Sequence, residues 1–165
     1  MSIAYDVGFT EQPELKTLDD FMGSLGFEIE APNQRRGQFT QVYVFNDGSV
    51  SPREIVFFYR LEPDNDQKSF FRKRSGEVKA YGSLTTYSTE LIHPTVEERL
   101  RIIEEKGVRT QHDYYRHLQP ERLKFYETAL ALRDHYHAIV RSEQTGEEIN
   151  PEAPFPPKRE PVRHN

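Results

Sequence analysis

Histidine and carboxylate side chains in the C-terminal half are the first candidates for chemistry. His112, Asp113 and His117 fall in one short predicted helix, and a spacing of four residues puts Asp113 and His117 on the same helical face. Imidazole and carboxylate groups both bind divalent metals, so a metal ion could approach this face. The other interpretation is that these are surface side chains of an amphipathic helix. We adopt the second interpretation and expect no metal site.

A pair of carboxylates could also support acid–base chemistry. Glu28 and Glu30 alternate with apolar residues in a predicted strand, so both point to one face of that strand. Two desolvated carboxylates there could bind a cation or exchange a proton with a substrate. The alternative is the solvated side of an edge strand, where charge deters pairing with other sheets.

Other catalytic signatures are missing from the sequence. There is no Gly-x-Ser-x-Gly nucleophile elbow and no glycine-rich phosphate loop. The chain has no cysteine, which excludes disulfides, thiolate metal sites and cysteine nucleophiles. We therefore expect no catalytic residue and no cofactor. Whether the protein is an enzyme stays open, and the sequence favours a protein that is not one.

One segment concentrates positive charge and aromatic rings. Its basic residues, with one from the strand that follows, are Lys68, Arg72, Lys73, Arg74 and Lys79. Phosphates could bind these cations while bases stack on the neighbouring rings. Against this, residues 1–33 carry one basic and seven acidic side chains, and the whole chain has a net charge of −5. A negative field repels phosphate, so nucleic acid is a less favoured partner.

The first 90 residues contain mostly strands. Alternating or continuous apolar patterns predict strands at 3–9, 27–30, 39–45, 53–62 and 78–87. One helix is predicted after Pro13, with Gly26 as its left-handed stop. Its apolar residues at helical spacing are Leu15, Leu18, Phe21, Met22 and Leu25. These elements predict a curved antiparallel sheet of about five strands with the helix on one face.

After residue 88 the pattern becomes helical, and two to three helices are predicted. Thr95 and Glu98 form a capping box at the start of a helix that ends at Gly107. The apolar residues on one face of this helix are Val96, Leu100 and Ile103.

The longest predicted helix begins at Pro120 and extends to about Glu143. The helix carries a wide apolar and aromatic stripe, which must be covered by the sheet or by a second chain. We predict that a partner covers part of the stripe. The residues expected to contact that partner are Tyr126, Tyr136, Ile139 and Val140.

Composition predicts one domain with a tail. The chain has 165 residues, of which 35% are hydrophobic and 12% aromatic. Residues 1–144 form the predicted α+β domain, mainly sheet over 1–90 and helical over 91–144. Residues 145–165 are polar and proline-rich, which predicts a disordered or draped tail. The N-terminus lacks a cleavable signal pattern and no stretch is apolar enough to span a bilayer, so we expect a cytoplasmic protein.

Residues 18–29, Leu-Asp-Asp-Phe-Met-Gly-Ser-Leu-Gly-Phe-Glu-Ile, resemble the helix-to-strand corner of the glyoxalase/bleomycin-resistance (vicinal oxygen chelate) family. The predicted strand–helix–strand–strand–strand order is compatible with one module of that fold. The resemblance implies a second module, which a partner chain would supply, and metal ligands at strand positions. The first 92 residues contain no histidine, and no residue role is carried over.

Three functions stay open from the sequence. The leading hypothesis is a small binding or regulatory protein that contacts another protein, or a second copy of itself to form a dimer. The alternative is a ligand-binding protein or enzyme with a pocket in the curved sheet, lined by Tyr43, Phe57, Tyr59 and Tyr81. The third is a protein that contacts nucleic acid through residues 68–79.

Overall fold

The computed structural model describes residues 3–30, 39–46, 54–62, 78–86, 95–117 and 120–155. The strands are β1 (Ile3–Phe9), β2 (Glu28–Ile29), β3 (Gln41–Asn46), β4 (Glu54–Arg60), β5 (Ala80–Thr86) and β6 (Ile139–Ser142). The helices in these ranges are α1 (Leu15–Ser24), α3 (Val96–Lys106), α4 (Gln111–Arg116) and α5 (Pro120–Tyr136). Within the described ranges, none of the helices combines the length and apolarity needed to cross a membrane.

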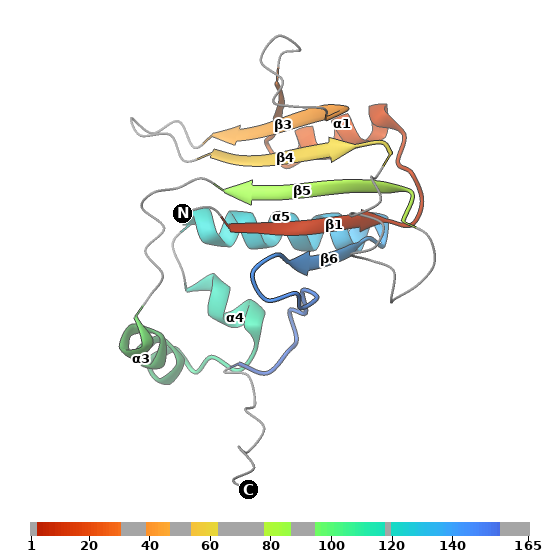
Figure 1. The fold of residues 1–165 in the computed structure, drawn as a ribbon. Helices are drawn as coiled ribbons and strands as arrows, with labels where there is room; N and C mark the ends of the chain where they lie inside the picture. Colours follow the sequence, from red (N-terminus) through yellow and green to blue (C-terminus); the bar gives the residue numbers. More distant parts are fainter. Residues whose placement is uncertain are drawn as a thin grey trace, which may run out of the picture.

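The strands form one six-stranded antiparallel sheet in the order β2-β3-β4-β5-β1-β6 (Figure 1). The N-terminal strand β1 lies inside the sheet, between β5 and the C-terminal strand β6. Val7, for example, pairs with Gly82 on one side and with Val140 on the other. The predicted α+β class is confirmed, with an antiparallel sheet, an N-terminal helix and C-terminal helices.

One face of the sheet carries the core, because α1 and α5 lie across it (Figure 1). Strand residues point alternately to this face and away from it, so every second side chain enters the core. The largest core side chains, all less than 2% exposed, are Tyr43, Tyr59, Tyr126, Phe9, Phe57, Leu18, Met22, Ile55, Leu84, Leu132 and Val7. The core is therefore rich in aromatic rings and draws on both helices.

Strand β5 shows the predicted alternation most clearly. Ala80, Gly82 and Leu84 point toward the helices, and Tyr81 points to the opposite face. A Cβ atom on Gly82 would lie 2.4 Å from the ring of Phe57 on the neighbouring strand. Only glycine fits at this position because the ring occupies the space where a side chain would start.

The end of α1 is anchored to α5. Gly26 has a left-handed φ of 91°, as its predicted role as a helix stop requires. The Lys124 Nζ of α5 donates a hydrogen bond to the Leu25 carbonyl and lies 4.8 Å from the centre of the Phe45 ring. The cation thus binds a free carbonyl at the end of α1, where the helix dipole is negative.

The long helix ends earlier than predicted. Its expected extension to Glu143 is wrong, because α5 stops at Tyr136 and β6 follows. His137 leaves the helix with a left-handed φ of 52°. The β-branched Ile139 and Val140 then pair with β1, which adds a sixth strand to the about five predicted.

Residues 143–155, which include the start of the predicted tail, pack against β6 and α4. The Ile149 amide donates to the Val140 carbonyl at 2.9 Å, so this segment lies along the outer edge of β6. Further on, the Gln111 amide at the start of α4 donates to the Ala153 carbonyl at 3.0 Å. The segment thereby joins the edge of the sheet to α4.

Candidate functional site

The four residues expected to contact a partner lie on two elements, and two of them are buried. Tyr126 of α5 is 0% exposed and Val140 of β6 is 1% exposed, because both belong to the core. Tyr136 and Ile139 are half-buried. The chain itself therefore buries Tyr126 and Val140, while Tyr136 and Ile139 keep part of their surface exposed.

Helix α3 carries apolar surface that the sheet does not cover. The helix lies beside α4, outside the layers formed by the sheet, α1 and α5 (Figure 1). Leu100 is 50% exposed, the highest value among the large hydrophobic side chains of the described residues. Ile102 and Ile103 of the same helix are half-buried.

The ends of α3 are stabilised by local hydrogen bonds. The Thr95 hydroxyl accepts from the Glu98 amide at 3.1 Å, and the Glu98 carboxylate accepts from the Thr95 amide at 3.3 Å. This reciprocal pair is the capping box that the sequence predicts. At the other end, Gly107 adopts a left-handed φ of 62° and donates its amide to the Ile103 carbonyl. These caps supply part of the stabilisation that α3 does not obtain from packing against the sheet.

Helix α3 meets α4 through Arg99. The guanidinium of Arg99 lies within hydrogen-bonding reach of the Tyr114 hydroxyl; burial raises the pKa of Tyr114, and the guanidinium opposes that rise. Val108, just after the helix, is 6% exposed and fixes the connection to α4. The charged side chains of Glu97 and Glu104 are exposed.

The sheet face opposite the helices carries a polar network. Asp6 of β1 points to this face and pairs with Ser83 of β5 on one side and Arg141 of β6 on the other. The Tyr81 hydroxyl donates to Asp6 Oδ1 at 2.5 Å. Asp6 is only 8% exposed, although none of the described helices lies over this face (Figure 1).

Two ionisable groups of this network have shifted pKa values. Burial raises the pKa of the Asp6 carboxyl, and the Tyr81 hydrogen bond and the Arg141 charge oppose that rise. Burial also raises the pKa of Tyr81, and its bond to Asp6 adds to the rise because a phenolate would face a carboxylate. A carboxyl and a phenol thus share a short hydrogen bond, which links β1 to β5.

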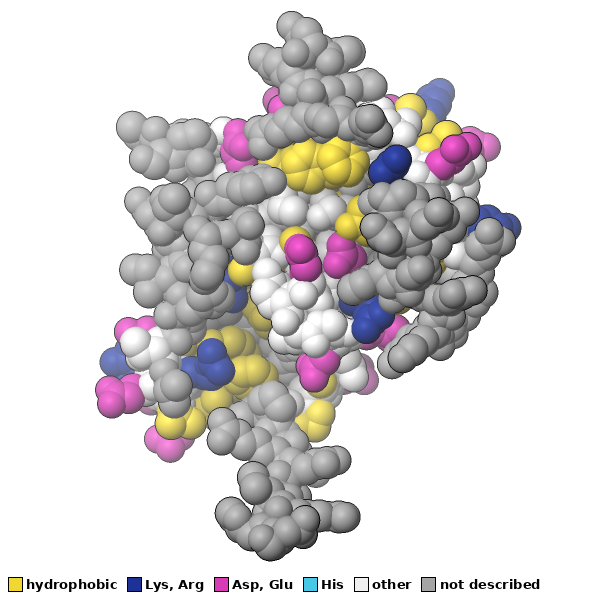
Figure 2. All heavy atoms as spheres, viewed as in Figure 1, with side chains coloured by type: hydrophobic (Ala, Val, Ile, Leu, Met, Phe, Trp, Pro, Cys, Tyr) yellow, Lys and Arg dark blue, Asp and Glu magenta, His cyan; other side chains and the backbone are white. Residues whose placement is uncertain are grey.

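Next to the polar network, the same face carries an apolar cluster toward β3 and β4 (Figure 2). Val42, Val56 and Phe58 are buried in it, and Phe39 and Val44 pack against them. The apolar runs in β3 and β4 follow from this arrangement, since both faces of these strands are packed.

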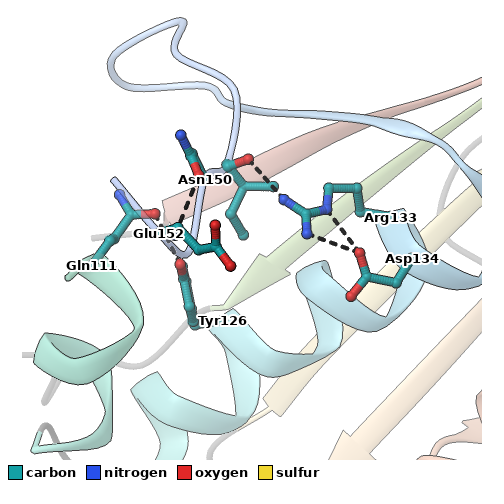
Figure 3. Close-up of polar contacts among 7 residues, drawn as sticks. Gln111, Tyr126, Arg133, Asp134, Asn150 and Glu152 are labelled. Atoms are coloured by element: carbon teal, nitrogen blue, oxygen red, sulfur yellow. Dashed lines mark hydrogen bonds and ion pairs between the residues drawn. The ribbon is translucent and has the colours of Figure 1, made fainter. Parts of the chain in front are cut away.

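A pocket of about 640 Å³ lies beside β6. Its walls are formed by Arg133, Arg141, Gly146, Glu147, Glu148, Ile149, Asn150 and Ala153. Arg133 donates to the Ile149 carbonyl at 3.3 Å and pairs with Asp134 at 2.8 Å (Figure 3). Arg141 donates from Nε and Nη2 to the Gly146 carbonyl, at 2.9 and 2.6 Å. Both guanidinium groups therefore bind the loop that forms the pocket wall.

The ring side chains expected to line a pocket in the sheet lie on two faces. Tyr43, Phe57 and Tyr59 come together on the helix side, where each is 0% exposed. The Tyr43 hydroxyl donates to Asp19 of α1 at 2.6 Å, so the helix fills the space where a pocket was expected. Tyr81 lies on the opposite face, in the network with Asp6.

The remaining candidates are dispersed. Lys79 is exposed, whereas Lys68, Arg72, Lys73 and Arg74 lie outside the described residues. His117 follows the end of α4 and is exposed, while His112 and Asp113 are half-buried. The described ranges contain no group of three or more side chains of metal-ligating type that could hold an ion.

Sequence reasoning missed the two places where described side chains gather outside the core. Leu100 was placed on an apolar face with Val96 and Ile103, but not among the residues expected to contact a partner. Asp6 was not singled out, although an acidic residue inside an otherwise apolar strand marks a buried polar contact. No family model, no curated protein and no solved structure matches the chain.

Proposed function

We propose that the protein is a non-enzymatic binding protein that acts through contact with another protein chain, and that α3 is its docking element. The observation that carries the proposal is the exposure of Leu100, at 50%, on a helix that lies outside the main layers. The apolar stripe of α5 has no need of a partner, because the sheet covers it.

The energetics of α3 favour a partner. The helix has 11 residues, and helices shorter than about 12–15 residues are marginal in water unless an apolar face is packed. Its capping box and its left-handed C-cap supply part of the missing stabilisation. A protein surface that covered Leu100 would remove the rest of its apolar area from water, which favours binding by about 1 kcal/mol.

The described polar groups support binding better than catalysis. The Asp6 carboxylate accepts from Tyr81, and the arginines of the pocket bind backbone carbonyls of the chain itself. Hydrogen bonds of this kind stabilise the fold and leave no nucleophile beside a free base among the described residues.

Position-specific photo-crosslinking tests the proposal. The photoreactive residue p-benzoylphenylalanine replaces Leu100 in one variant and Leu15 in a control; Leu15 is 38% exposed on α1. Irradiation in cells should join the chain to a discrete second protein from position 100 and not from position 15. Equal crosslinking from both positions, or none from position 100, would overturn the proposal.

A further inference from the structure

We propose that the partner of α3 is the same helix of a second copy of this chain, packed alongside it in parallel orientation. This inference rests on the proposed function, in which α3 is the docking element, and specifies its occupant. The charge pattern along the helix carries the argument.

The apolar residues of α3 have the spacing of a coiled-coil seam. Leu100 and Ile103 lie three residues apart on one side of the helix, and in the sequence Val96 precedes Leu100 by the four residues that such a seam requires. Leu100 lies at the centre of this seam and is the most exposed of the large hydrophobic side chains in the described ranges. In a parallel pair related by a two-fold axis, Leu100 therefore meets Leu100 of the second copy.

The two borders of the seam carry opposite charges. Glu97 and Glu104 follow one border, and Arg99 and Lys106 follow the other, each pair seven residues apart. All four side chains are exposed. The seam is thus flanked by an acidic row and a basic row on a single helix.

Opposite rows select the parallel orientation. Two parallel copies place the basic row of one helix against the acidic row of the other, so Arg99 meets Glu104 of the second copy. The two-fold axis makes this contact twice. Two antiparallel copies place like charges together, which opposes pairing.

Part of α3 is exposed, as the 50% exposure of Leu100 shows. The helix lies at the edge of the molecule in Figure 1, with α4 on one side. Arg99 already faces the Tyr114 hydroxyl, but a guanidinium has several N–H donors and one phenol engages only part of them. A seam of about 16 Å buries less than a standard interface, so we expect a weak dimer with a dissociation constant on the order of 100 µM.

Sedimentation velocity of the full chain, from about 5 µM to about 500 µM, tests the inference across this range. The wild-type mass average should rise toward that of a dimer. Leu100→Glu should abolish the rise, and Leu15→Glu, at a comparable exposed leucine of α1, should leave it unchanged. Circular dichroism of each variant establishes that it is folded.

A charge exchange tests the orientation. Arg99→Glu and Glu104→Arg should each weaken dimerisation about tenfold, because each replaces two attractive contacts by two repulsive ones. The double variant R99E/E104R should restore the wild-type constant. An equimolar mixture of the two single variants should also associate as the wild type does, because the heterodimer regains both contacts.

The outcomes separate this inference from the proposed function. A wild-type chain that stays monomeric overturns self-pairing, while crosslinking from position 100 still decides whether α3 docks on another protein. Association that needs Leu100 but is not restored in the double variant overturns the parallel register alone. Association that is insensitive to Leu100→Glu overturns self-pairing through α3, and crosslinking from position 100 again decides the proposed function.

Discussion

Buried tyrosines make the fold sensitive to alkali. Tyr5, Tyr43, Tyr59 and Tyr126 are at most 8% exposed, and burial raises the pKa of each, to about 12 for Tyr59. An unfolded tyrosine ionises near its ordinary pKa of about 10. The unfolded chain therefore loses protons that the folded chain retains. The stabilisation is fully present below about pH 10 and is lost as the pH rises through the folded-state values.

The size of the effect follows from the same linkage. Between about pH 10 and pH 11, each tyrosine that stays protonated only in the folded chain lowers the free energy of unfolding by about 1 kcal/mol. Four such groups lower the free energy of unfolding by about 4 to 6 kcal/mol at pH 11, which is comparable to the total stability of many domains. We therefore predict cooperative unfolding over a narrow alkaline range.

Urea unfolding followed by circular dichroism, at a series of pH values from 8 upward, measures this loss of stability. Because the chain has nine tyrosines and no tryptophan, ultraviolet absorbance reports tyrosinate formation without interference. The buried tyrosines should ionise together with the loss of secondary structure. An unchanged urea midpoint at about pH 11, or ionisation of all nine tyrosines while the fold persists, would refute the reasoning.

Tyr59→Phe is the matched variant. It keeps the ring and removes a hydroxyl whose bond to the Pro13 carbonyl is long, at 3.5 Å, so stability at neutral pH should change little. The alkaline loss of stability at pH 11 should fall by about 1 kcal/mol, since the linked proton of one tyrosine is gone. An undiminished loss in this variant would show that Tyr59 does not contribute.

Three further changes should be measurable by urea or thermal unfolding. Gly82→Ala should lower the free energy of unfolding by about 2 kcal/mol, because the added Cβ would overlap the Phe57 ring. Gly23→Ala should stabilise α1 by about 0.5–1 kcal/mol, because no atom lies within 4 Å of the added Cβ. Equal effects of the two substitutions would contradict the packing argument. His137→Gly should stabilise by about 1 kcal/mol because it relieves a left-handed φ of 52°, and a loss of stability would argue against strain there. Burial raises the pKa of Asp6, so the stabilisation that its protonated carboxyl gives is fully present below about pH 4 and is lost as the pH rises. Asp6→Asn should lack this loss of stability. A difference in free energy of unfolding between wild type and variant that stays constant from about pH 4 to pH 7 would contradict this prediction.

Local elements were predictable because short-range physics determines them. The alternation in 78–87 predicted a strand there, and Thr95 with Glu98 predicted the start of α3. Gly26 ended α1 because glycine adopts the left-handed conformation at low cost. Each of these features depends on contacts within a few residues.

The end of α5 was predicted incorrectly because a strand competed with the helix. Ile139 and Val140 continue the apolar spacing of the helix, but they are β-branched and also suit a strand. Pairing with β1, more than 130 residues earlier in the chain, decided the outcome. Sequence spacing alone contains no information about that distant edge.

The sequence by itself determined which residues form amphipathic helices and alternating strands, since the side-chain periods of 3.6 and 2 arise within each element. Only the tertiary structure decided which apolar faces the chain covers for itself. The stripe of α5 lies on the sheet and Leu100 of α3 remains half exposed, although both are apolar helical surfaces. Likewise, Asp6 and Tyr81 are 75 residues apart and meet only because β1 inserts beside β5. Such choices depend on the summed free energy of contacts between distant segments, which no local pattern specifies.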